Sequence, residues 1–141
     1  MTRLHADAID RLLDVHFPQA HHGGRVMFIE TLGPDETVVR LRQNERNMRP
    51  GNTVSGPAMF ALADWGTYVA ILAQQGEAAL QAVTTNITLN FMRRPEPGDI
   101  LATVRLIKSG KRLIVAEIVM RSEGHGEIVT HAIATYAMPP R

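Results

Sequence analysis

One carboxylate stands out in the longest apolar stretch of the sequence. Residues 54–73 contain a single formally charged group, Asp64, among mostly apolar neighbours. A carboxylate removed from water costs free energy unless another group pairs with it, so a chemical role is the first explanation to consider. Within reach of a water molecule Asp64 can serve as a general base, and direct attack on a carbonyl carbon is the alternative. The ordinary explanation is a structural aspartate that bonds Tyr68 one turn later, a neighbouring strand or another subunit.

A second candidate group lies at the start of the same stretch. Ser55 is a good N-cap residue, and Gly56 and Pro57 are tolerated in a first helical turn, so a helix is expected to begin here and to stop at Gly76. The unpaired N–H groups of a helix start suit a carbonyl oxygen that gains negative charge, and Gly56 has no side chain to block its approach. A tight entry to the helix explains the glycine equally well.

The spacing of these two groups predicts more than one chain. Eight residues of helix separate Gly56 from Asp64, which is roughly 12 Å along the helix axis. Both groups of one chain cannot easily reach the same carbonyl carbon. We therefore expect Gly56 of one subunit to face Asp64 of another, in an obligate dimer.

The rest of the pattern supplies the elements that must hold this helix. An N-terminal helix is expected over residues 2–17, ended by Pro18, and strands at 26–32 and 37–42 are expected to form a hairpin. A polar linker over 43–52 leads to the long helix. Alternating apolar residues then predict four more strands, at 83–92, 100–108, 113–120 and 128–138. This order predicts one α+β domain in which an antiparallel sheet wraps around the long central α-helix.

Composition narrows the classes of function. The 141 residues are 45% hydrophobic and 21% charged, with a formal net charge of +1, six histidines and no cysteine. A nearly neutral chain has no electrostatic reason to bind nucleic acid or a membrane surface, and without cysteine there is no disulfide, thiolate zinc site or cysteine nucleophile. The N-terminus lacks the apolar core of a signal peptide, and Asp64 argues against a membrane-spanning long helix. We expect a soluble, cytoplasmic protein with no cofactor and no metal site, because the histidines form no ligand constellation.

Several motifs, taken together, resemble a known family. They are the stretch 51–56 leading into Leu62-Ala63-Asp64, the strand and turn over 84–95, Pro97-Gly98-Asp99 and the turn at 108–112. Over roughly residues 25–138 the chain resembles the hotdog-fold thioesterase superfamily, and within it the acyl-CoA thioesterases of the phenylacetate-pathway type. The resemblance implies a 25–138 core, with residues 1–24, a helix and a loop, as an N-terminal extension of the single domain. The resemblance implies hydrolysis of an acyl-CoA or aryl-CoA thioester to the free acid and coenzyme A. It also implies a homodimer or a dimer of dimers, with active sites at the subunit interface.

The resemblance implies roles for particular residues of this chain. Asp64 matches the catalytic carboxylate, the Gly56 N–H matches the group that polarises the thioester carbonyl, and Thr84 matches a hydroxyl that assists the attacking water. Further substrate contacts are expected from the helix entry, the helix, the following strand and the basic ends of strands, which suit the phosphates of coenzyme A. They are Asn52, Ser55, Pro57, Tyr68, Asn86, Arg93, Arg94, Lys108, Lys111 and Arg112. Coenzyme A enters only as part of the substrate.

Two departures from the family pattern leave another function open. Many relatives carry His-Gly-Gly where this chain has Ser55-Gly56-Pro57, and often an asparagine where it has Arg49. The missing histidine removes one substrate contact, which makes a non-catalytic module that binds acyl or aromatic ligands the main alternative. A hydratase or dehydratase of the same fold is disfavoured, since no histidine lies on or beside the helix to pair with Asp64.

Overall fold

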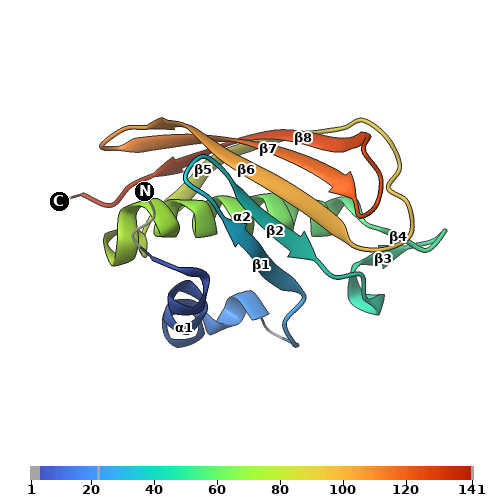
Figure 1. Ribbon diagram of the computed structural model, residues 1–141, viewed down its shortest axis with the longest axis horizontal. Helices are drawn as coiled ribbons and strands as arrows, with labels where there is room; N and C mark the ends of the chain where they lie inside the picture. Colours follow the sequence, from blue (N-terminus) through green and yellow to red (C-terminus); the bar gives the residue numbers. More distant parts are fainter. Residues whose placement is uncertain (1–3, 22, 141) are drawn as a thin grey trace.

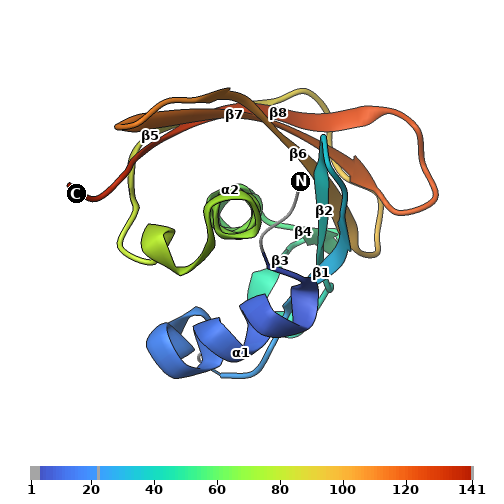
Figure 2. The same cartoon turned by 60° about the vertical axis from the view of Figure 1, so that its left-hand side comes forward.

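Six strands form one antiparallel sheet in the computed structural model, which describes residues 4–21 and 23–140. The strands are β1 (Met27–Leu32), β2 (Thr37–Leu41), β5 (Val83–Phe91), β6 (Ile100–Ser109), β7 (Leu113–Ser122) and β8 (Ile128–Ala137), in the order β1-β2-β6-β7-β8-β5. The sheet curves over the long helix α2 (Gly56–Gln75), as Figures 1 and 2 show from two directions. The predicted hairpin and the sheet around a central helix are thus confirmed.

The polar linker carries short elements that the sequence pattern did not indicate. A short hairpin of two two-residue strands, β3 (Met48–Arg49) and β4 (Thr53–Val54), precedes α2. Three 3₁₀ turns, one of them in the linker, flank the larger elements. These turns are η1 (Pro18–His21), η2 (Glu45–Asn47) and η3 (Gly76–Ala79). Elements of two to four residues leave no periodic signature, so they fall below what hydrophobic alternation can resolve.

Helix α2 begins and ends as its sequence indicates. The Ser55 Oγ accepts a hydrogen bond from the Ala58 N–H at 3.3 Å, and the chain leaves the helix at Gly76 with φ of +78°. Residues 65–73 are all buried, but Phe60 is 44% exposed. The second half of α2 is thus enclosed, whereas its first turns are less covered, because no described element covers Phe60.

A glycine in the middle of α2 brings the helix close to the sheet. A Cβ placed on Gly66 would lie 2.8 Å from a Val39 methyl carbon of β2 and 3.2 Å from a Val104 methyl carbon of β6. No real Cβ tolerates the shorter contact, so the helix and the two strands approach at a distance that only glycine permits. This close packing fixes the height of α2, and hence of Asp64, above the sheet.

The N-terminal segment packs on the opposite side of α2 from the sheet, as Figure 2 shows. Its helix α1 runs from Ala6–His16, later than the predicted start at residue 2, since Leu4 lies before the first turn and residues 1–3 are outside the described chain. Ile9 and Leu13 are fully buried against the core. Arg25 pairs with Asp10 at 3.0 Å and with Asp14 at 3.1 Å, which ties α1 to the approach of β1.

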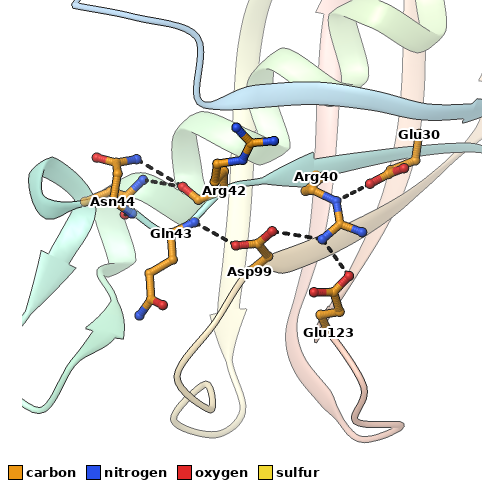
Figure 3. A network of polar contacts seen from close by, with 8 residues as sticks. Glu30, Arg40, Arg42, Gln43, Asn44, Asp99 and Glu123 are labelled. Atoms are coloured by element: carbon orange, nitrogen blue, oxygen red, sulfur yellow. Dashed lines mark hydrogen bonds and ion pairs between the residues drawn. The ribbon is translucent and has the colours of Figure 1, made fainter.

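Arg40 of β2 joins several parts of the sheet through one ionic network (Figure 3). Its guanidinium pairs with Glu30 of β1, with Asp99 just before β6 at 2.9 Å, and with Glu123 just after β7 at 2.6 Å. The hydrogen bond to Glu30 raises the pKa of Arg40 above its already high value, so the group stays charged. Because the network serves to hold strand ends together, we assign it to stability.

Strand β5 is an edge of the sheet, and it is exposed on both of its faces. It pairs only with β8, and Val83 and Phe91 at its two ends are 59% and 55% exposed. Helix α2 covers this strand incompletely. A long edge strand with exposed apolar residues is a surface that natural proteins normally cover. None of the helices among the described residues has both the length and the apolar character to cross a membrane.

Candidate functional site

Three elements meet at the Asp64 carboxylate. Its Oδ1 accepts a hydrogen bond from the Thr84 hydroxyl of β5 at 2.5 Å and from the Tyr136 hydroxyl of β8 at 2.6 Å. Tyr136 also lies 2.9 Å from the Asp64 carbonyl oxygen. Within the described chain no group donates to Oδ2, the other carboxylate oxygen. Asp64 is half-buried rather than enclosed, so Oδ2 is free to accept a proton or a hydrogen bond.

Tyr136 is a site residue that the sequence did not single out. Burial, together with its hydrogen bond to Asp64, raises the pKa of the Tyr136 phenol, so the hydroxyl remains a proton donor at neutral pH. The register of β5 against β8 sets Thr84 directly opposite Tyr136, which explains why both hydroxyls reach the same oxygen. The alternation along 128–138 placed Tyr136 on a buried face, and that was the available signal.

Tyr68 does not bond Asp64, although it lies one helical turn beyond it. The Tyr68 hydroxyl donates instead to the Leu80 carbonyl at 2.5 Å, which secures the segment between α2 and β5. Its ring stacks on the Tyr136 ring with centroids 6.2 Å apart, and burial raises the pKa of its phenol. The structural alternative for Asp64 is therefore partly correct: a neighbouring strand supplies its partners, and Tyr68 does not.

Asp64 and Thr84 lie in the wall of a cavity of about 780 Å³. This size is within the range of small-molecule sites. The walls come from α2, β5, β8, the segment before β5 and the end of the N-terminal segment. The larger apolar and aromatic side chains that line it are Phe17, Met27, Trp65, Tyr68, Leu80 and Tyr136. The result is a largely apolar chamber whose wall includes the Asp64 carboxylate and the two hydroxyls that bond it, those of Thr84 and Tyr136.

Gly56 lies in a different cavity, of about 510 Å³, at the start of α2. As the first helical residue its N–H has no partner inside the helix. Three arginines, Arg49, Arg93 and Arg94, line this cavity with Gly56 and Phe91.

Two of the arginines at the Gly56 cavity are held by neighbouring groups. The Arg94 guanidinium packs over Gly51, where a Cβ would lie 1.7 Å from Arg94 Nη2, and the backbone of Gly51 has φ of +99°. Arg93 is ion-paired with Glu127. The structure thus groups two of the predicted basic contacts around Gly56, and it separates them from Asp64.

The basic residues of the β6–β7 turn lie at the other end of α2. Lys108, Lys111 and Arg112 are exposed there, and the Ser109 hydroxyl between them bonds the Gln74 side chain near the end of α2 at 2.9 Å. Because α2 spans 20 residues, these groups are roughly 30 Å from the arginines at its start. The predicted basic contacts are therefore two separate groups in a single chain.

The remaining predicted contacts lie away from the Asp64 cavity. Ser55 caps α2, and with Pro57 it lines a third cavity, of about 330 Å³. Asn52 is in the turn between β3 and β4, where its carbonyl accepts from the Gln43 side chain at 2.9 Å. Asn86 lies on exposed β5 and accepts from Thr88 at 3.3 Å. Among the described residues, no group of three or more His, Asp or Glu side chains could hold a metal ion.

Comparison with protein families identifies the class. The family described as "Thioesterase superfamily" matches residues 51–129, which is more than half of the chain and includes Gly56, Asp64 and Thr84. The chain belongs to this superfamily, and its antiparallel sheet around a central helix is the hotdog fold.

Individual relatives follow the same pattern. A crystal structure named "putative thioesterase", from Silicibacter sp. TM1040, is 43% identical, with a TM-score of 0.88 over 99% of this chain and 95% of that one. A phenylacetic acid degradation-related protein from Ralstonia eutropha is 20% identical over 79% of this chain and 84% of that one, and its TM-score of 0.70 shows the fold alone. A "putative esterase" from Saccharolobus solfataricus is 25% identical over 71% of this chain, which spans 65% of that relative.

Proposed function

We propose that this protein hydrolyses acyl-CoA or aryl-CoA thioesters, with Asp64 as the residue that activates water. The observation that carries the proposal is the Asp64 carboxylate in the wall of a largely apolar cavity, with one oxygen held by Thr84 and Tyr136 and the other without a donor among the described residues. An apolar chamber suits the acyl group, and a half-buried carboxylate in its wall suits a general base. Membership of the thioesterase superfamily supports thioester hydrolysis as the class of reaction.

The proposed reaction follows from these groups. Asp64 Oδ2 accepts a proton from a water molecule as the water oxygen attacks the thioester carbonyl carbon. The carbon–sulfur bond then breaks, the acid is released and the thiolate of coenzyme A takes up the proton that Asp64 holds, which restores the carboxylate. The Thr84 hydroxyl, which donates to Oδ1, keeps oxygen lone pairs that can orient the water. Direct attack by Asp64 to form an anhydride would use the same free oxygen.

The Gly56 N–H is proposed to bind the carbonyl oxygen as it gains charge, but it must come from a second subunit. Gly56 and Asp64 of one chain line separate cavities, at roughly 12 Å along the helix. Val83 and Phe91 at the two ends of β5 and Phe60 of α2 are exposed apolar side chains, and a second copy would cover them. The three arginines that line this cavity with Gly56 would supply positive charge for the phosphates of coenzyme A, which the pantetheine arm holds away from the thioester itself.

Thiol release from a panel of acyl-CoA and aryl-CoA esters tests the catalytic assignment. Asp64→Asn keeps the shape of the side chain and removes the base, so we expect turnover to fall by at least a hundredfold. The absence of cysteine in the chain keeps the thiol background low. If every ester is inert while the protein still binds them, the non-catalytic ligand-binding module is the correct function. Equal rates for Asp64→Asn and the parent would remove Asp64 from the mechanism.

A matched pair of variants tests the Gly56 N–H. Gly56→Pro removes the N–H at a helix position that favours proline, whereas Gly56→Ala keeps it and adds a Cβ at 3.4 Å from the Phe91 ring, an ordinary contact. We expect Gly56→Pro to lose about a hundredfold in kcat and Gly56→Ala to stay within a few-fold of the parent. Equal effects of the two variants would show that the N–H is not used.

Mixing two inactive variants tests the shared site. In a mixed dimer of Asp64→Asn and Gly56→Pro chains, one site contains both intact groups and the other contains neither. Random re-association should therefore restore about one quarter of the parent activity. No recovery in a mixture that has exchanged subunits, or a monomer by light scattering at micromolar concentration, would refute the two-subunit site.

A further inference from the structure

We propose that the N-terminal segment made of α1 and η1 is the wall that selects the acyl group, with Phe17 as the specificity-determining residue. The inference rests on the proposed function and adds to it where the acyl group lies and what limits its size. His16, Phe17 and Ala20 of this segment line the same cavity as Asp64. The family match begins at residue 51, so this wall lies outside it, whereas Asp64 and Thr84 lie inside.

Phe17 is placed to contact whatever enters the cavity. Its ring meets the Tyr68 ring edge to face, with centroids 6.1 Å apart. Tyr68 follows Asp64 by one helical turn, so the two side chains lie on the same face of α2. Phe17 is nevertheless 41% exposed in the free protein, which leaves part of a large apolar ring without a partner. An acyl chain that extends from Asp64 past Tyr68 would cover that ring.

The wall is anchored, and it therefore sets a real limit. Fully buried Ile9 and Leu13 fix α1 to the core, and Arg25 is paired with two aspartates of α1. Beyond Phe17, the His21 ring packs edge to face against Trp65 of α2, with centroids 6.0 Å apart. A segment held from both sides of Phe17 cannot move aside without losing this packing.

The lining also states the chemistry of the acyl group. Among the described residues, no lysine or arginine lines this cavity, and Asp64 is the one carboxylate in its lining. An acyl chain that ends in a carboxylate would be repelled by Asp64 and would find no lysine or arginine to pair with. The cavity should therefore accept uncharged aliphatic or aromatic acyl groups and reject dicarboxylic ones, for whose charge the described lining offers no lysine or arginine.

The test compares Phe17→Ala with Phe17→Leu and Val15→Ala across a straight-chain series of acyl-CoA esters, a benzoyl ester and a dicarboxylic ester. Phe17→Ala removes the aromatic ring that this wall presents to the cavity, so the most favoured acyl chain should lengthen by two or three methylenes. For esters longer than the parent's optimum, kcat/KM should rise about fourfold for each methylene newly buried. Phe17→Leu keeps the bulk and should keep the length profile. Val15 lies in the last turn of α1, two residues before Phe17, is 73% exposed and does not line this cavity, so Val15→Ala should leave the length profile unchanged.

Two outcomes separate this inference from the proposed function. If the parent hydrolyses no ester, the proposed function fails. The role of the N-terminal segment is then tested by binding of the same esters to the protein, followed by the fluorescence of Trp65, the single tryptophan, which lines the cavity. If Phe17→Ala has the same free energy of unfolding as the parent and also keeps the parent's dependence on acyl-chain length, in turnover or in binding, the inference is overturned. Hydrolysis or binding of the dicarboxylic ester as well as its uncharged counterpart would overturn the assigned chemistry.

Discussion

The hydroxyl of Tyr136 is the feature of the site that a single substitution can isolate. Tyr136→Phe deletes one oxygen and keeps the ring that stacks on Tyr68, so no cavity is created. The loss is two contacts with Asp64, at 2.6 Å to Oδ1 and at 2.9 Å to the carbonyl oxygen. We expect both stability and turnover to fall, because the carboxylate loses one of the two hydroxyls that hold it.

The magnitude follows from the charge and exposure of the acceptor. A hydrogen bond to a charged group contributes roughly 1.5–3 kcal/mol, and one between neutral groups roughly 0.5–1.5 kcal/mol. Asp64 is half-buried, so water can replace part of the lost bond, and we expect about 1.5 kcal/mol for Tyr136→Phe. In an Asp64→Asn background the acceptor is neutral, and the same substitution should cost only about 0.5 kcal/mol.

Urea unfolding of the four proteins in this double-mutant cycle measures the difference as a coupling energy of about 1 kcal/mol. Turnover gives a second measurement: if the bond aligns the base, kcat should fall about tenfold while KM changes little. If Tyr136→Phe leaves kcat unchanged and the coupling energy is below about 0.3 kcal/mol, the view that Tyr136 holds the carboxylate is refuted.

Two further substitutions test packing and pH dependence. Gly66→Ala gains about 1 kcal/mol of helix propensity, but its Cβ lies 2.8 Å from a Val39 methyl carbon, so urea unfolding should show a net loss of about 1 kcal/mol in stability. In a Val39→Ala background, where that methyl carbon is absent, the loss caused by Gly66→Ala should disappear. A Gly66→Ala protein more stable than the parent would refute the close approach. For His21, burial and then Arg25 lower the pKa from 6.5, while Asp14 and Asp10 raise it, so the unfolded chain binds the proton first. Because neutral His21 is favoured in the folded state, its contribution to stability is present above about pH 7 and is lost as the pH falls through 6.5, by at most about 1.4 kcal/mol per pH unit. The difference in unfolding free energy between the parent and His21→Gln should therefore shrink between about pH 7.5 and 5.5.

The sequence predicted those parts of the fold that depend on local pattern. The alternation of apolar residues located the six strands of the large sheet to within a few residues, and Ser55 and Gly76 marked both ends of α2. One charge in an apolar helix was enough to indicate Asp64. Thr84 entered only through resemblance to a family, since a threonine on a strand carries no signal of its own.

The partners of Asp64 could not be predicted, for a physical reason. Alternation assigns a residue to a face of a strand, but it says nothing of which strand lies alongside or in what register. The pairing that sets Thr84 opposite Tyr136 joins residues 52 positions apart in the sequence (136 − 84). The contact of Phe17 with Tyr68 is likewise tertiary, and the basic residues that looked alike as strand ends proved to lie at opposite ends of α2.

The position of β8 in the sheet has a consequence for how the site forms. Strand β8 follows all the others in the chain, yet it lies between β7 and β5. During synthesis, β5 therefore waits without a partner strand until β8 has left the ribosome, and Thr84 waits with it. The hydroxyl of Tyr136 arrives in the same step. No fragment that ends before β8 can hold the carboxylate as the finished protein does, so the site is assembled at the end of folding and all at once.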